Sequence, residues 1–146
     1  MKKILLVLMF AIAANCISAQ DFKKLKISVG ILKWEDAKNE IDKLANDPKS
    51  QSNPEFFYYQ ARVYAAIFKD SALSAKYTKA VDIASAALAK YAALDASYSK
   101  FKALGPEPIA DLYSSYLQLG NKYFFDDKLN KEAGENHFNS SLYFDL

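Results

Sequence analysis

The chain has 146 residues, of which 51% are hydrophobic and 25% are Asp, Glu, Lys or Arg, the balance of a globular protein. Its one cysteine, Cys16, lies in the predicted leader and its one histidine is His137, so disulfides, zinc-finger clusters and Cys/His nucleophilic pairs are excluded for the mature chain. Outside the predicted leader, which contains Lys2 and Lys3, 17 basic residues balance 17 acidic ones, and this neutrality argues against nucleic-acid binding.

The N-terminal residues have the pattern of a secretory signal peptide. Lys2 and Lys3 precede an apolar run, 4–14, and the small-residue exit Ile17-Ser18-Ala19 follows. As a helix the run spans roughly 16 Å, about half of the hydrocarbon core of a bilayer, which argues against a membrane anchor. We therefore expect a signal peptide at 1–19, a mature domain at 20–146, and export to the periplasm or cell envelope.

The alternative for the leader is a lipoprotein signal with acylation of Cys16. Such a site requires an aliphatic residue three positions before the cysteine and a small residue directly before it. Ala13 and Asn15 occupy these positions, so the pattern favours the signal peptide.

The first part of the mature chain is predicted to be helical over 21–46, with a break near Gly30. Apolar side chains recur at spacings of three, four and three on one helical stripe, at Trp34, Ala37, Ile41 and Leu44. Asp47-Pro48 is expected to end this segment, because a residue before proline is disfavoured in the helical region.

A polar linker, 50–53, is followed by a helix start at Asn53-Pro54-Glu55, with a capping side chain, proline in the first turn and an acidic residue at the positive helix end. The helix is predicted over 55–68 and ends near Asp70. The alanine-rich stretch 72–93 is predicted as one helix because of its high intrinsic propensity.

The remaining elements are separated by the proline-rich break 105–108. We expect a short helix over 95–104, a long helix over 109–125, a turn at 126–130 and a last helix over 131–144.

Aromatic and small residues recur at helical spacing in a way that suggests a repeat. A small residue on one helix admits a bulky ring from its antiparallel neighbour, and a stack of such hairpins buries a continuous core. The residues expected to pack between helices are Trp34, Ala37, Ile41, Phe57, Ala61, Tyr64, Tyr116, Gly120, Tyr123 and Phe138.

This pattern resembles the tetratricopeptide repeat (TPR) family, whose units pair an aromatic, Leu-Gly and Tyr on one helix with small and aromatic residues on the next. The third unit matches best, through Tyr116, Leu119-Gly120 and Tyr123. The resemblance implies an all-α, right-handed solenoid of about three degenerate units of stacked antiparallel hairpins. A plain helical bundle is the structural alternative.

The resemblance also implies a concave groove, lined by the first helix of each hairpin, that holds an extended partner segment. Matching positions place Glu55, Tyr58, Arg62, Leu117, Asn121, Phe124 and Phe125 in this groove. Leu117 stands where the family's carboxylate clamp would have a lysine, so recognition of a free C-terminus is not expected. For Phe124 and Phe125, packing against a neighbouring helix is an equal alternative.

The sequence shows no pattern typical of an active site, a metal site or a cofactor site. Asp126, Asp127, Asn130 and Glu132 lack the alternating ligands and central glycine of a calcium loop, which favours a solvated turn. His137 has no Cys or second His to act with. Asp70-Ser71-Ala72 makes Ser71 a candidate for O-glycosylation, although helix capping by Asp70 is the simpler interpretation.

The function predicted from the sequence is a non-enzymatic protein–protein interaction or scaffold module of the bacterial cell envelope, without cofactor. The apolar end Leu142, Tyr143, Phe144 and Leu146 has no polar cap, which predicts a truncated array or docking of this face on another protein or a second copy. The alternatives are a self-associating structural subunit and a helical-bundle enzyme or small-ligand carrier.

Overall fold

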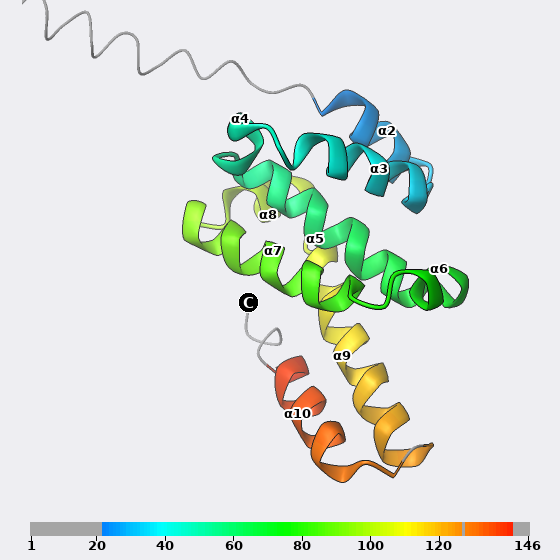
Figure 1. Ribbon diagram of the computed structural model, residues 1–146. Coiled ribbons are helices and arrows are strands. Elements are labelled where there is room, and N and C mark those ends of the chain that lie inside the picture. Colours follow the sequence, from blue (N-terminus) through cyan, green and yellow to red (C-terminus); the bar gives the residue numbers. More distant parts are fainter. Residues whose placement is uncertain (1–21, 127, 142–146) are drawn as a thin grey trace, which may run out of the picture.

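Figure 1 shows the structure, a computed structural model that describes residues 22–126 and 128–141. Within these two stretches every regular element is a helix and none is a strand, which confirms the predicted all-α class. The predicted signal peptide 1–19 with Cys16, Asp127 of the predicted turn, and the apolar end 142–146 lie outside the described residues.

The predicted break near Gly30 is confirmed, because α2 (Lys23–Gly30) and α3 (Trp34–Leu44) are separate helices. Leu32 turns the chain with a left-handed φ of 58°. The amides of Leu32 and Lys33 donate to the carbonyls of Val29 and Ser28 at 3.1 and 2.9 Å, and so satisfy the end of α2.

The two Pro-containing helix starts follow from side-chain capping. Asp47 accepts from the amide of Lys49 and starts the one-turn helix α4 (Pro48–Gln51), so Pro48 begins an element as well as following the end of α3. Asn53 accepts from the amide of Glu55 at 2.9 Å and starts α5 (Pro54–Lys69), as the sequence predicted.

The prediction of one helix over 72–93 is wrong. The stretch contains two helices, α6 (Ser71–Lys76) and α7 (Ala80–Leu94), with a break at 77–79. Asp70 caps α6 by accepting from the amides of Ala72 and Leu73. Tyr77 then leaves the helical conformation, and its hydroxyl donates to Glu35 of α3 at 2.8 Å. A contact with a distant helix therefore overrides the propensity of the alanine-rich sequence.

The C-terminal part begins with α8 (Ser99–Leu104), which is shorter than the predicted 95–104. The long helix α9 (Glu107–Phe125) starts two residues earlier than predicted, because Pro108 is tolerated in the first turn of a helix. The last described helix is α10 (Asn130–Ser141).

In the described chain the longer helices pair as three hairpins, α2 with α3, α5 with α7, and α9 with α10 (Figure 1). α5 also packs on α3 of the preceding hairpin and on α9 of the following one, and α7 packs on α9. The hairpins are therefore layered in chain order, with α5 and α7 in the middle.

The core lies between these layers and combines large rings with alanines. Buried rings include Phe22, Phe56, Phe57, Tyr58 and Tyr91, while the side of α7 that packs inward carries Ala80, Ala84 and Ala87. Among the residues expected to pack between helices, those buried are Ala37, Ile41, Phe57, Ala61, Tyr64, Tyr116 and Gly120, and Trp34 and Tyr123 are half-buried.

Phe138 differs from this expectation, since it is 64% exposed. Its neighbour His137 lies against Gly120 instead, and a Cβ added to Gly120 would overlap the His137 ring. The ring that meets the small residue of α9 therefore comes one position earlier on α10 than the repeat pattern placed it.

Replacing Gly120 with alanine is expected to lower the free energy of unfolding by about 1 kcal/mol, because the added methyl group displaces the His137 ring. The matched control is Gly134→Ala on α10, whose new methyl group would have no described neighbour within 4 Å outside its own helix turn, and which should stabilise by about 0.5–1 kcal/mol. Urea denaturation followed by circular dichroism measures both. Equal stabilisation by the two substitutions would contradict the contact, and His137→Ala should convert Gly120→Ala into a stabilising change.

Candidate interaction surface

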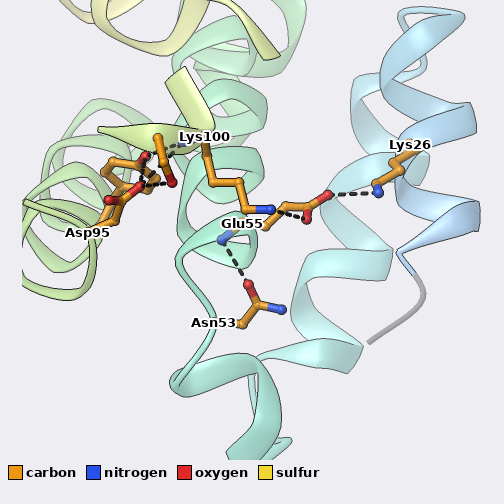
Figure 2. Close-up of polar contacts among 7 residues, drawn as sticks. Lys26, Asn53, Glu55, Asp95 and Lys100 are labelled. Carbon is orange, nitrogen blue, oxygen red and sulfur yellow. Dashed lines mark hydrogen bonds and ion pairs between the residues drawn. The ribbon is translucent and has the colours of Figure 1, made fainter. Parts of the chain in front are cut away.

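The predicted groove begins on α5 with Glu55, whose carboxylate is engaged within the chain (Figure 2). Its Oε1 lies 2.7 Å from Nζ of Lys26 on α2, and its Oε2 lies 3.3 Å from Nζ of Lys100 on α8. Only 15% of the Glu55 side chain is exposed. Glu55 therefore links three helices and is not a free anionic contact for a partner.

The pKa of Glu55 is lower than that of an ordinary glutamate. Burial raises this pKa, but the hydrogen bonds and charges of Lys26 and Lys100 lower it by more. A carboxyl group whose pKa is lowered on folding stabilises the protein above its unfolded pKa, and this stabilisation is lost as the pH falls through its folded pKa.

We expect Glu55→Gln to lower the free energy of unfolding by about 1–2 kcal/mol at pH 7, because both ion pairs lose their negative partner. The difference from the wild type should close as the pH falls below about 4.5, the unperturbed value. Urea denaturation at pH 7 and pH 3 measures this, with the exposed Glu132→Gln as control. A difference that stays constant with pH would contradict the assigned ion pairs.

Tyr58 was expected to line the groove, but it is 0% exposed. Its hydroxyl lies within hydrogen-bond distance of the carbonyls of Leu104 and Gly105, at 3.1 and 3.2 Å, and its ring packs edge-on against Phe101 at 5.1 Å. Burial raises the pKa of Tyr58 to about 12. The α8 segment thus covers this part of α5, and Tyr58 offers no surface to a partner.

The covering segment is held by a cluster that the sequence analysis did not single out. Phe101 packs edge-on against Tyr91 at 4.7 Å. Asp95, which Figure 2 labels, accepts from the Tyr91 hydroxyl at 2.7 Å. Hydrogen bonds from Ser97, Tyr91 and Ser99 lower the pKa of Asp95. The spacing Asp95, Ser97, Ser99 is the sequence signal that could have indicated a capped turn before α8.

Further along α5, two cations point to α9. Arg62 lies 3.6 Å from Oε2 of Glu107, and Lys69 lies 2.7 Å from Oδ1 of Asp111. Arg62, which was expected in the groove, therefore lies in the seam between α5 and α9, with 22% of its side chain exposed.

The open part of the predicted groove is the second half of α9. Leu117 is half-buried, Asn121 is exposed, and Phe124 and Phe125 are 52% and 69% exposed. The two rings pack edge-to-face with centroids 4.9 Å apart. Spacings of four and three place Leu117, Asn121 and Phe124 on one stripe, which we call the α9 stripe.

Beside this stripe, α9 forms a hollow of about 520 Å³ with α5, α6 and the turn before α7. Its lining mixes apolar and polar side chains: Phe68, Ser74, Ala75, Thr78, Gln118, Leu119, Lys122 and Tyr123. The accessible second half of α9 is thus flanked on one side by a concave surface.

The other features considered from the sequence are the Ser71 modification site, metal-binding clusters and membrane-spanning helices. Ser71 is exposed at the start of α6, next to the capping Asp70, and its glycosylation stays a prediction. Among residues 22–126 and 128–141, no group of three or more His, Cys, Asp or Glu is arranged to hold a metal ion. In the same part of the chain, no helix is long and apolar enough to cross a membrane.

Comparisons with protein-family models, with curated proteins and with solved structures gave no match for this chain. The resemblance to the TPR family thus depends on the sequence pattern given above.

Proposed function

We propose that the protein is a TPR-like array of three helical hairpins that acts as a non-enzymatic protein–protein interaction module of the bacterial cell envelope. The pairing of α2/α3, α5/α7 and α9/α10, with α5 packed on the helices before and after it, supports the array. In the TPR family the first helix of each hairpin lines the binding groove, and α2, α5 and α9 are the first helices here.

The observation that carries this proposal is the α9 stripe. Phe124 and Phe125 present ring surface to solvent on the same helix end as the exposed amide of Asn121. Aromatic side chains supply much of the binding energy at protein interfaces, and an Asn amide both donates to and accepts from a peptide backbone.

Because α8 covers Glu55 and Tyr58, the binding surface is shorter than the sequence predicted. A partner segment would lie along Leu117, Asn121 and Phe124, with an apolar side chain on the Phe124 ring. This is a small surface, so we expect a transient complex with modest affinity.

The proposal is tested by pull-down from a bacterial envelope extract with the chain beginning at Gln20. A partner should be captured by the wild type, and Phe124→Ala should reduce capture about tenfold or more, the range of an interface hot spot. The control is Ile31→Ala, which removes an equally exposed apolar side chain between α2 and α3. Equal capture by the wild type and Phe124→Ala would contradict the assignment.

One observation also favours a self-associating structural subunit. Phe124, Phe125 and Leu129 gather exposed apolar surface around the turn between α9 and α10. If this surface pairs two copies, sedimentation of the purified chain shows a mass that rises with concentration, and Phe125→Ala restores the monomer. A concentration-independent monomer mass excludes this alternative.

A further inference from the structure

A second hollow, of about 360 Å³, lies between α3, α5 and the start of α7. It is separate from the α9 stripe and shares only Thr78 with the hollow beside α9. Its lining residues are Lys38, Tyr64, Lys76, Tyr77, Thr78, Lys79, Ala80 and Ile83. We call it the lysine hollow, because three lysines line it, Lys38 from α3, Lys76 from the end of α6 and Lys79 from the turn before α7.

Two of the three lysines have counter-ions. Lys38 Nζ lies 2.6 Å from Asp42 on the same helix, and Lys76 pairs with Glu35 of α3. Lys79 is exposed and forms no ion pair with any described residue. The lysine hollow therefore carries one positive charge more than its paired carboxylates balance, and Asp82, one turn along α7, is the nearest acidic residue in sequence.

The floor of the hollow is aromatic. The ring of Tyr77 lies between two lysines, 4.8 Å from Nζ of Lys38 and 5.1 Å from Nζ of Lys76. The tyrosine hydroxyls are already used, since Tyr64 donates to Asp42 at 3.1 Å and Tyr77 donates to Glu35. Tyr64 is only 5% exposed, so the apolar surface open to a ligand is that of Ile83 and of the part of Tyr77 that the two lysines leave uncovered.

We propose that the lysine hollow binds a carboxylate attached to an apolar body. The apolar body would cover Ile83 and the uncovered part of Tyr77, and the carboxylate would accept from the ammonium of Lys79. A ligand without charge forms no ion pair with Lys79, and a small inorganic anion leaves the apolar lining in water.

Benzoate is the probe, because it joins a ring to one carboxylate. Titrated into isotope-labelled protein, it should shift the backbone amide resonances of Thr78, Lys79 and Ala80 in a saturable way. Lys79→Met keeps the length of the side chain and removes its charge, and it should weaken binding about tenfold. Lys49→Met on α4, which does not line the hollow, should leave binding unchanged.

Two further ligands test the need for the charge and the kind of molecule that carries the carboxylate. Benzamide, the neutral analogue, should bind at least tenfold more weakly than benzoate. A blocked Phe-Glu dipeptide carries its carboxylate on a side chain, and the tighter of dipeptide and benzoate shows whether a peptide or a small molecule is the source. Equal binding of benzoate and benzamide, or unchanged binding by Lys79→Met, would overturn the proposal.

Discussion

Tyr58→Ala is expected to lower the free energy of unfolding by about 3–5 kcal/mol, the range for removing a large buried ring. The ring of Tyr58 is buried against Phe101, and its hydroxyl reaches the backbone carbonyls where α8 ends. Alanine therefore leaves a cavity between α5 and α8 and removes the donor for these carbonyls. Urea denaturation followed by circular dichroism measures the loss.

Two control variants complete this prediction, one that separates packing from hydrogen bonding at Tyr58 and one that removes an exposed ring. Tyr58→Phe keeps the ring and should cost about 1 kcal/mol for the lost hydroxyl. Phe124→Ala removes an exposed ring from α9 and should cost less than about 1 kcal/mol. A Tyr58→Ala protein as stable as Phe124→Ala would contradict the burial of Tyr58 beneath α8.

The difference in stability loss between substitutions at the buried Tyr58 and at the exposed Phe124 decides which substitutions can test partner binding. A Tyr58 variant that loses binding has also lost much of its stability, so the loss would say nothing about a groove. Phe124 and Asn121 lie on an exposed stripe, and substitutions there change the surface with little effect on the core.

The sequence predicted the fold where local physics dominates. Gly30, Asn53-Pro54 and the break at 105–108 mark helix ends through capping and backbone restrictions, and the structure has helix ends at or near each. The sequence was misleading at 77–79, because the alanine content of 72–93 reports intrinsic propensity alone. The hydrogen bond from Tyr77 to Glu35 joins residues that are distant in sequence, and no local pattern indicates it.

The candidate site was predictable in part. The resemblance to the TPR family placed Leu117, Asn121 and Phe124 in a groove, and in the structure Asn121 and Phe124 are exposed while Leu117 is half-buried. The sequence pattern could not show that the connection before α9 folds back over α5. Lys100 and Phe101 cover Glu55 and Tyr58 from a segment more than forty residues away, so only the tertiary structure separates the covered residues of the predicted groove from the accessible ones.

Ala84→Leu is the second substitution with a large expected effect, a loss of about 1–3 kcal/mol or more in the free energy of unfolding. Ala84 is 0% exposed on the side of α7 that packs against the core, and α7 packs most extensively on α5. The larger side chain must move α7 away from its neighbour or adopt a strained rotamer, because the interior has no room for it.

The control for this prediction is Ala86→Leu, two residues along the same helix and exposed to solvent. Alanine and leucine have similar helix propensities, so this change should shift the free energy of unfolding by no more than about 0.5 kcal/mol. Urea denaturation of both variants under one set of conditions isolates burial as the cause. Equal stability of the two variants would contradict the close approach of α7 to α5, on which the stacking of ring-bearing and alanine-bearing helices depends.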